Sequence, residues 1–498
     1  MNREEALKII RETDRTSHYY YHAMSILSVD GVTAAPKQSW RGRAETTGFL
    51  SGQVWELTNR PEFAEALELL KNDTSLPKDD ARLVELLRES MEEIRLFTRD
   101  EFVARQQLLT EADNYWHEAK EKSDYSLFAP YLEKLIRDQK ELARRKDASK
   151  QPYDVLLDMY EKGTSTRTLD PFFELISRDL RPVVEQVADA PQPRVDFLHR
   201  VYPIHLQRVF SDRVMALMGI DRERCSIGET EHPFTDGVNK WDVRITTKYL
   251  ETDVASSLYS VIHEGGHALY EMGVRDEYQF TSLAGGSSMG LHESQSRFYE
   301  NLIGRSRAFT HALFPICREL FPEQTADVTE EEWYRAVNLS RPSLVRTEAD
   351  ELTYPFHVMI RYELEKQMIN GDVPVSELPG MWNELYRKEL GVIVSNDREG
   401  ILQDSHWSGG AFGYFPSYAL GSAYGVQMLE SMNREMNVEE LVKQGDLAPV
   451  TAWLQKRIHQ YGRSLTPAQL LESADVSPFE PEKYTRYLRE KFTSLYNL

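Results

Sequence analysis

Residues 254–273 read VASSLYSVIHEGGHALYEMG and carry a histidine pair inside an apolar helical pattern. Thr252 or Asp253 can cap the start of this helix, and Gly273 can end it. An apolar stripe recurs with the helical period, so one side should be buried. The stripe consists of Val254, Leu258, Val261, Ile262 and Leu269. The two adjacent glycines weaken a helix by roughly 1 kcal/mol each relative to alanine, which indicates close approach of a substrate or of another backbone segment.

His263 and His267 lie one helical turn apart in this stretch, and Glu264 follows the first of them. Both imidazoles therefore point to the same side and can bind one zinc ion. In this HExxH pattern the glutamate reaches the metal-bound water and acts as a general base. The alternative is an ordinary helix that carries two surface or core histidines.

A catalytic zinc site needs a third protein ligand and one open position. A glycine-rich turn at 284–290 is followed by LHESQSR at 291–297, which predicts a second helix. Glu293 on that helix is the candidate third ligand; the alternative is a glutamate that only interacts with the helix dipole. His292 competes for the role, but its side chain would point about 100° away from that of Glu293. We predict one zinc ion per chain, held by the histidine pair and Glu293.

Composition and charge exclude several classes of protein. A hydrophobic content of 41% and a charged content of 28% are typical of a soluble globular chain. The net charge of −21 argues against a nucleic-acid partner. No apolar run approaches the roughly 18 residues of a membrane span, and the charged residues at 3–5, with no apolar run after them, lead us to expect no secretory signal. Cys225 and Cys317 are too few for a disulfide framework, so we expect free thiols and a cytoplasmic protein.

The first third of the chain is predicted to be helical. No glycine occurs from Gln53 to Lys162, and neither glycine nor proline occurs at 78–129. Helical periodicity is visible in Leu83, Leu86, Leu87, Met91 and Ile94. We expect long antiparallel helices packed as a hairpin between Pro77 and Pro130, with a coiled-coil rod as the alternative.

The middle of the chain, from about residue 182 to 425, concentrates glycine, histidine and aromatic residues. The segment 241–247 alternates as a half-exposed strand does. Asp242, Arg244 and Thr246 share one of its faces, and the strand would either pair with a substrate backbone or form an ordinary buried hairpin.

The tail returns to helices, with breaks near Pro449, Pro467 and Pro478. Linkers of Gly, Ser or Pro are absent, so we interpret residues 1–498 as a single domain. It would have an N-terminal helical lobe to about residue 180, a catalytic region at about 181–425 and C-terminal helices at about 426–498.

Further motifs follow in order along the chain: His232-Pro233-Phe234, Asp242–Thr246, Val345–Asp350, Gly400–Trp407 and Gly413–Tyr418. With HExxH and the His-Glu-Ser-Gln element at 292–295, they resemble the motif set of the thermostable carboxypeptidase 1 family of metallocarboxypeptidases. The resemblance is dense from about His232 to Tyr424 and looser through the tail. It includes no motif in the N-terminal third.

This resemblance implies a mainly α fold of the large helical gluzincin type. A deep substrate groove would be walled by N- and C-terminal helices, with a few short strands near the metal. The family's members are homodimers that use Zn²⁺, for which Co²⁺ can substitute. They remove C-terminal residues from peptides with broad specificity and disfavour a terminal proline.

The resemblance also implies roles for side chains beyond the metal ligands. Related gluzincins use a histidine and tyrosines to stabilise the oxyanion, which assigns this task to His406, Tyr414 and Tyr418; the alternative for the tyrosines is a place in the core. Pro416 predicts a bent segment between the two tyrosines.

An exopeptidase must also bind the terminal carboxylate, and a guanidinium suits this task. Arg346 is the candidate because its motif is shared with the family. Arg244 and Arg297 are alternatives, and a structural ion pair with Glu348, Asp350 or Glu351 is the competing explanation for Arg346. His232 and Asp404 would orient ligands around the substrate and metal.

Two other functions fit the same sequence. A second enzyme would keep the metal chemistry but remove dipeptides or cleave internally, as related gluzincins do. A non-enzymatic helical scaffold with an inert zinc site is the third possibility, and loss of hydrolysis in a Glu264→Gln variant separates it from the first two.

Overall fold

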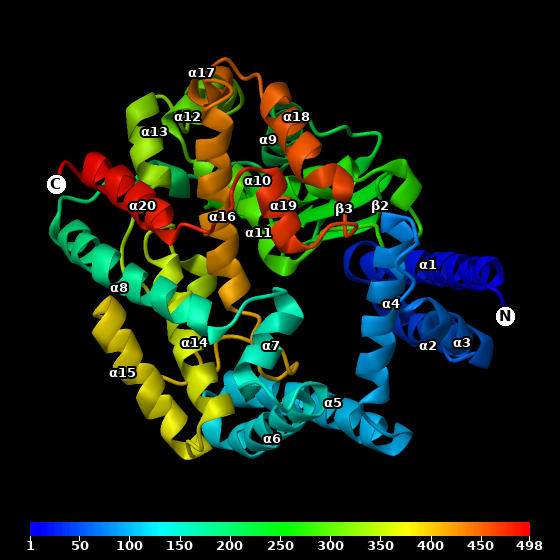
Figure 1. Cartoon of the computed structure of the whole chain (residues 1–498). Coiled ribbons are helices and arrows are strands. Elements are labelled where there is room, and N and C mark those ends of the chain that lie inside the picture. Colours follow the sequence, from blue (N-terminus) through cyan, green and yellow to red (C-terminus); the bar gives the residue numbers. More distant parts are fainter.

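The computed structural model describes the backbone of residues 1–498 and all side chains except those of Glu93 and Ile94. The apolar position predicted at Ile94 therefore lies outside the described side chains. Helices dominate, and a single small sheet lies between them (Figure 1). The helices before the sheet are α1 (Arg3–Thr33), α2 (Trp40–Thr58), α3 (Pro61–Leu70), α4 (Lys78–Arg95), α5 (Arg99–Lys122), α6 (Ala129–Lys146), α7 (Pro152–Tyr160), α8 (Thr166–Asp189) and α9 (Ile204–Leu217).

The sheet consists of β1 (Cys225–Glu229), β2 (Thr235–Asn239) and β3 (Asp242–Thr247). The helices after it are α10 (Val254–Gly273), α11 (Met289–Arg297), α12 (Arg307–Leu320), α13 (Glu330–Val337), α14 (Tyr354–Asn370), α15 (Leu378–Leu390), α16 (Pro416–Asn433), α17 (Val438–Lys443), α18 (Ala448–Arg457), α19 (Pro467–Ser473) and α20 (Pro481–Tyr496). A mainly α fold with a few short strands beside the histidine-bearing helix is therefore confirmed.

The hairpin predicted for residues 78–129 is wrong in its partners. Helix α4 packs against α3 and stands at a steep angle to α5, whereas α5 packs against α6 (Figure 1). The break between α4 and α5 is a capping box at Thr98, whose hydroxyl accepts the N–H of Glu101 while the Glu101 carboxylate accepts the N–H of Thr98. This reciprocal cap starts a new helix direction without any proline or glycine.

Two hydrophobic cores hold the helices together. The larger core runs from α5 to the C-terminal helix and encloses α10, α11, α14 and α16. The smaller core joins α1, α3 and α4 to residues 274–283, which directly follow α10. The cores divide near residue 95, well before the lobe boundary expected at about 180, and the single domain remains our interpretation.

Strand β3 lies in the middle of the sheet, in the order β1-β3-β2. It pairs in parallel with β1, with Val243 opposite Cys225, and antiparallel with β2, with Ile245 opposite Thr235. Both of its edges are occupied, so of the two alternatives for this strand, pairing with a substrate backbone is excluded. Its apolar face instead packs against α10, which places β2 beside the histidine pair.

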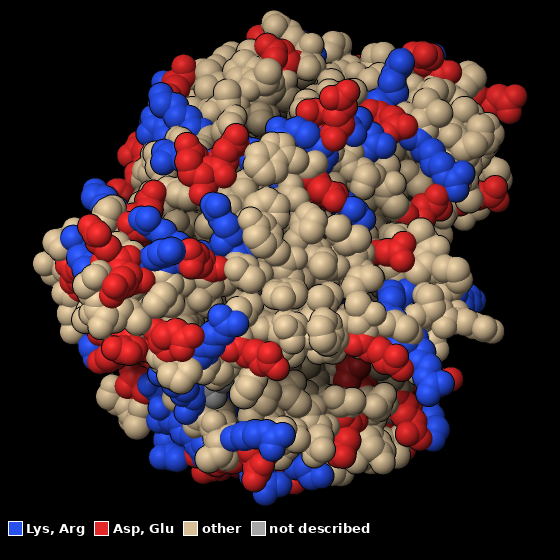
Figure 2. Space-filling view, turned by 90° about the vertical axis from the view of Figure 1, so that its right-hand side faces the viewer, with Lys and Arg blue, Asp and Glu red and all other residues tan. Residues whose placement is uncertain are grey.

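The face over α1 to α4 has lysines, arginines and acidic residues around a broad uncharged area (Figure 2). Large apolar side chains are exposed on α1 and α2, among them Tyr19, Trp40, Phe49 and Trp55. Among the residues that the structure describes, no helix has the length and apolar character needed to cross a bilayer.

Both cysteines are free thiols, as predicted, and both are buried. Cys225 lies at the start of β1 and Cys317 in α12. Burial raises the pKa of each thiol.

Candidate active site

Helix α10 forms as its sequence predicts. The Asp253 side chain accepts the N–H of Ser256 at 3.1 Å, and Gly273 is the last helical residue. Its apolar stripe is buried, so the helix is fixed in the larger core. The imidazoles of His263 and His267 point to the same side of this helix, with ring centroids 5.1 Å apart.

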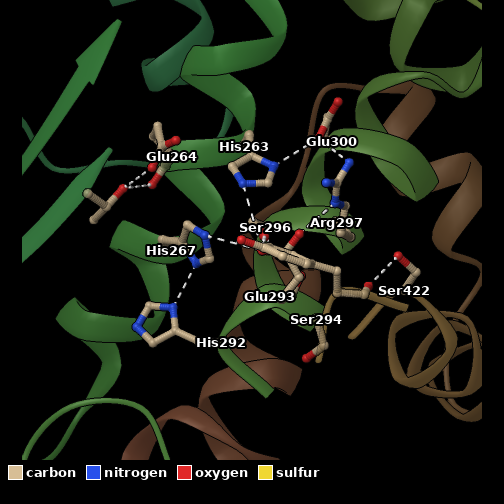
Figure 3. Close-up of polar contacts among 12 residues, drawn as sticks. His263, Glu264, His267, His292, Glu293, Ser294, Ser296, Arg297, Glu300 and Ser422 are labelled. Atoms are coloured by element: carbon tan, nitrogen blue, oxygen red, sulfur yellow. Dashed lines mark hydrogen bonds and ion pairs between the residues drawn. The ribbon is translucent and has the colours of Figure 1, made fainter. Parts of the chain in front are cut away.

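Glu293 on α11 faces the histidine pair (Figure 3). Its Oε2 lies 3.9 Å from Nε2 of His263 and 3.8 Å from Nε2 of His267. Potential ligand atoms of these three side chains all lie within 4.8 Å of one another, and no other such trio occurs among the described residues. The predicted convergence of two imidazoles and one carboxylate is therefore present in the structure.

Glycines bring the three helices of this site into close approach. A Cβ atom on Gly266 of α10 would lie 2.5 Å from the carbonyl oxygen of Gln295 in α11. A Cβ on Gly421 of α16 would lie 2.8 Å from Cβ of Glu293. Gly266 thus accommodates the α11 backbone rather than a substrate, while its neighbour Gly265 faces the side chains of Met218 and Ile220.

The start of α11 is held from outside the helix. The Ser288 hydroxyl caps it by accepting the N–H of Leu291. Glu161, at the end of α7, accepts the Ser288 hydroxyl and the N–H of Gly290, both at 3.0 Å. Burial raises the pKa of Glu161 to about 7 despite these two hydrogen bonds. A buried carboxylate therefore fixes the helix that carries Glu293.

Each metal-facing histidine is oriented through its second ring nitrogen. His263 Nδ1 lies 2.8 Å from Oε2 of Glu300. His267 Nδ1 lies 2.6 Å from Nδ1 of His292, whose Nε2 lies 2.7 Å from Oε1 of Glu271. In the consistent tautomers, His267 donates to His292, which donates to Glu271, and both Nε2 lone pairs face Glu293. His292 thus orients His267 and is not part of the trio, so it does not compete with Glu293.

Glu293 is oriented too, because Arg297 Nε donates to its Oε1 at 2.7 Å. This leaves Oε2 toward the histidines. Burial by itself raises the pKa of Glu300, but Arg297, His263 and Arg305 outweigh it, so that pKa is lowered. Burial also lowers the pKa of His267 well below its usual value, with nearby His292 adding to the effect. Burial by itself lowers the pKa of His263, but Glu300 and Glu293 outweigh it, so that pKa is raised. A metal ion binds the neutral imidazole, so its binding would displace any proton from His263 Nε2.

Two imidazole nitrogens and one carboxylate oxygen are the donor set of catalytic zinc sites with an open position. The hydrogen bonds behind each donor are those that fix tautomer and ring orientation in such sites. The residues therefore fit a divalent metal ion, and they would hold it through His263 Nε2, His267 Nε2 and Glu293 Oε2.

Glu264 lies beside the trio on the side of the sheet (Figure 3). Its carboxylate is buried, and Thr235 of β2 donates its hydroxyl to Oε2 at 2.6 Å. Burial raises the pKa of Glu264, partly offset by His263 and Thr235. A carboxylate with a raised pKa is a stronger base than an exposed one, as a general base requires.

His406, Tyr414 and Tyr418 come together at the start of α16. His406 Nε2 lies 3.1 Å from the Tyr418 hydroxyl, and the two tyrosine rings are 5.2 Å apart. Pro416 is the first residue of α16, so Tyr414 precedes the helix and the segment bends as expected. Burial raises the pKa of Tyr414, and the charge of Glu293 adds to the effect. Gly421, three residues after Tyr418 on α16, packs against Glu293, so this end of α16 lies beside the trio. Burial lowers the pKa of His406 to about 4.

Glu365, which sequence reasoning missed, anchors the loop before α16. It is fully buried on α14 and accepts three hydrogen bonds of 2.8 Å, from the Tyr153 hydroxyl, the Trp407 indole and the N–H of Gly413. Gly413 has φ +93°, and a Cβ there would meet the backbone of Leu156. The loop is thereby fixed one residue before Tyr414.

Arg346 is buried and paired with Asp404, not with Glu348, Asp350 or Glu351. Its Nε and Nη2 donate to Oδ1 of Asp404 at 2.9 and 2.8 Å, and its Nη1 donates to the Tyr354 hydroxyl at 3.0 Å. A guanidinium has five N–H groups, so two remain for another acceptor. Asp404 also accepts from Arg361, so it orients arginines rather than a metal ligand.

The other two arginine candidates form ion pairs with acidic residues close to them in the sequence. Arg244 forms a two-pronged pair with Asp242 at 2.8 and 2.7 Å, and Arg297 binds Glu293 and Glu300. His232 is exposed, and its recorded hydrogen bond is the Thr230 hydroxyl donating to its backbone carbonyl. His232 is not one of the potential ligands that converge in the trio.

Known proteins match almost the whole length of this chain. A sequence model of the carboxypeptidase Taq (M32) metallopeptidase family matches residues 9–492. Carboxypeptidase 1 of Bacillus subtilis (strain 168) is 38% identical over 487 residues, which cover 97% of each chain. Thermostable carboxypeptidase 1 of Pyrococcus furiosus is 35% identical over 477 residues, 95% of each chain.

Solved structures agree. The M32 carboxypeptidase from Deinococcus radiodurans R1 has a TM-score of 0.96 at 33% identity and covers 99% of this chain and 100% of that one. PZ peptidase A, at 12% identity and a TM-score of 0.54, shares the fold alone.

A histidine-pair helix approached by a glutamate-bearing helix, inside an almost wholly helical fold, defines a metallopeptidase of the HExxH type. The chain belongs to the carboxypeptidase Taq (M32) metallopeptidase family. It is accordingly a metallocarboxypeptidase that acts on peptides and depends on a divalent metal ion, and the resemblance seen in the sequence is confirmed.

Proposed function

We propose that this enzyme is zinc-dependent and releases C-terminal amino acids from peptides with broad specificity, with Glu264 as its general base. The observation that carries the proposal is the approach of Glu293 Oε2 to within 3.9 Å of both histidine Nε2 atoms. The neighbouring Tyr414 supports it, because a hydroxyl on that side can donate to a developing oxyanion.

His263, His267 and Glu293 would hold a zinc ion with one open coordination position, and that ion would polarise the scissile carbonyl and lower the pKa of water. Glu264 takes the proton of the attacking water on its carboxylate and delivers it to the nitrogen of the leaving amino acid. Thr235 holds that carboxylate beside the trio, since its hydroxyl occupies one side of Oε2.

The oxyanion is stabilised by donors from the start of α16. Tyr414 and Tyr418 carry hydroxyls whose pKa values are raised by burial, so they stay protonated and can donate. His406 is neutral at pH 7 and bonds Tyr418, which supports a role for His406 in orienting that hydroxyl.

Arg346 is proposed to bind the terminal carboxylate with the two N–H groups that Asp404 and Tyr354 leave free. Its guanidinium lies 5.0 Å from the Tyr418 ring centroid, which supports a place near the reacting bond. Arg244 and Arg297 remain the alternatives, since each uses two of its five N–H groups in its own ion pairs and keeps three.

The test is the product pattern of a short N-blocked peptide with the wild type and with Glu264→Gln. We expect single amino acids to appear stepwise from the C-terminus with the wild type. Glu264→Gln should abolish nearly all hydrolysis while zinc stays bound, because the metal trio is untouched. Glu277→Gln, an exposed residue just after α10, is the matched control.

The same experiment separates the alternatives. Dipeptides or internal fragments would indicate the second enzyme class, and unchanged hydrolysis in Glu264→Gln would remove the assigned base. Metal analysis of the purified protein, followed by reconstitution with Zn²⁺ or Co²⁺, tests the identity of the ion.

The homodimer stays a proposal that rests on the family resemblance. The exposed Trp40, Phe49 and Trp55 on α2 support it, because large apolar side chains left open to solvent favour association. Sedimentation equilibrium measures the state directly. A cytoplasmic location also remains a prediction.

A further inference from the structure

Two cavities meet along helix α4 on the N-terminal side of the site. One, of about 350 Å³, is bordered by α4, α7 and residues 287–288. The other, of about 630 Å³, is bordered by α1, α2 and α4. Leu86, Glu89, Met159 and Arg463 line both of them. The two cavities therefore form one continuous groove, with Arg463 where they join.

The backbone of Arg463 is fixed from two sides. Its N–H donates to the carbonyl of Leu283 at 2.8 Å, and Arg82 Nε donates to its carbonyl at 3.1 Å. The preceding Gly462 has φ +50°, and a Cβ on it would lie 2.4 Å from the Leu283 carbonyl oxygen. Only glycine fits at this position, so the backbone next to Arg463 is held in one conformation, which directs Arg463 to the groove.

The Arg463 guanidinium is half-buried and has no hydrogen-bond or ion-pair partner among the described residues. Other cations of the groove are paired: Arg82 with Glu85 at 2.7 Å and Lys162 with Glu89 at 2.5 Å. Asp14 is likewise engaged, by the N–H and hydroxyl of Ser282. Burial and the charge of Arg82 lower the pKa of Arg463, and the more weakly acting charges of Glu89 and Asp14, neither of which bonds the guanidinium, offset part of this effect.

The groove leads to the reaction site. Tyr160 lines it together with Ser288, and its ring centroid lies 5.2 Å from that of Tyr414. Ser288 caps the helix of Glu293. A peptide that leaves the metal trio along Tyr160 thus reaches Arg463 and can continue toward α1 and α2.

We propose that Arg463 binds an acidic side chain of the peptide substrate, upstream of the bond that is cleaved. This rests on the proposed carboxypeptidase function. A partly desolvated guanidinium without an acceptor is best satisfied by a carboxylate, which it binds in a two-pronged manner. The groove continues beyond Arg463, and each residue of a peptide spans only about 3.5 Å, so a peptide lying in the groove extends past this arginine. The carboxylate at Arg463 is therefore that of a side chain and not the terminal carboxylate of the peptide.

The test uses N-acetylated decapeptides of alanine and glycine with a constant C-terminal residue. One Asp is moved through the upstream positions, and each peptide has an Asn partner. We expect the wild type to cleave the Asp peptide about tenfold faster or more in kcat/KM at one position, as a hydrogen bond between charged groups provides. Arg463→Met should remove that preference and leave the Asn peptides unchanged, and Arg463→Lys should keep part of it.

Lys150→Met is the matched control, because Lys150 lines the same groove but pairs with Asp147. It should retain the Asp preference. Equal rates for Asp and Asn peptides at every position in the wild type would overturn the proposal, and so would equal slowing of both series by Arg463→Met. The wild-type comparison needs no variant, so misfolding of Arg463→Met leaves it decisive.

Failure of the proposed function is recognised separately. If no peptide releases a free amino acid, binding is compared instead: peptides of the same sequences, with an N-terminal fluorophore in place of the acetyl group, are titrated with Glu264→Gln, and fluorescence anisotropy compares Asp with Asn. A preference of about tenfold there supports the Arg463 site, and its absence excludes the site.

Discussion

Replacing His292 by leucine should weaken metal binding although His292 is not a ligand. Its Nδ1 lies 2.6 Å from Nδ1 of His267 and accepts the proton that leaves His267 Nε2 free for the ion. The His267 side chain is only 16% exposed, and leucine fills much of the space of the lost ring, so water does not easily replace the acceptor.

The magnitude follows from the unsatisfied N–H group. Leaving a buried donor without its acceptor costs about 1–3 kcal/mol. A middle value of about 2 kcal/mol corresponds to roughly thirtyfold in an equilibrium constant. Removing the groups that orient metal-bound histidines weakens metal affinity by about 10–100-fold in other sites. The two estimates agree.

The assay is a competition titration of metal-free protein with Zn²⁺ against a chromophoric chelator. His292→Gln is the informative companion, because its amide oxygen can still accept the His267 proton and should restore most of the affinity. His311→Leu, at an exposed histidine paired with Glu330, is the control. Equal affinity of wild type and His292→Leu, or equal weakness of His292→Leu and His292→Gln, would refute the tautomer argument.

Three further perturbations test other contacts. Gly266→Ala should destabilise the fold by about 1–3 kcal/mol and weaken zinc binding, since its Cβ meets the α11 backbone. In Gly265→Ala the new Cβ meets only the flexible ends of Met218 and Ile220, so stability and zinc affinity should change less than in Gly266→Ala. Equal effects of the two variants in denaturant unfolding and in zinc titration would contradict the close-approach argument. Because burial raises the pKa of Glu161 from 4.5 to about 7, this residue's contribution to stability is complete below pH 4.5 and falls as the pH rises to 7. The free energy of unfolding of Glu161→Gln should therefore rise relative to that of the wild type by up to about 3 kcal/mol between pH 4.5 and 8. The favourable interaction of a carboxylate with the α11 N-terminus reduces this gain. A difference in unfolding midpoints that stays constant across this pH range would exclude the argument from the raised pKa. Arg346→Lys should raise KM for free-acid peptides about tenfold, while an amidated peptide stays an equally poor substrate. Arg361→Lys is the control, because Arg361 shares Asp404 but is fully buried, and it should leave KM unchanged. An unchanged KM in Arg346→Lys would rule out Arg346 as the group that binds the terminal carboxylate.

The metal trio was predictable because its information is local. Histidines four residues apart on an apolar helix must face the same side, and the glycine-rich turn before Glu293 predicts the start of a second helix. The capping of α10 by Asp253 and the bend at Pro416 follow from the same short-range rules.

What the sequence did not reveal depends on contacts between distant segments. Strand order places β3 in the middle of the sheet, and no feature of residues 241–247 distinguishes a central from an edge strand. Glu271, Glu300 and Glu365 look like ordinary helical glutamates until the helices are packed together.

One signal was present but missed. Thr98 and Glu101 have the spacing of a capping box, and that pair would have divided residues 78–129 at the point where α5 begins.

The burial of both native thiols makes this chain suitable for site-directed labelling. Cys225 and Cys317 are 2% and 0% exposed, and a thiol reacts with maleimides only as an accessible thiolate. A cysteine introduced at Ser51 on α2 and another at Lys150 would therefore take up a donor and an acceptor dye without background. Energy transfer between them would report the width of the groove as a peptide enters it.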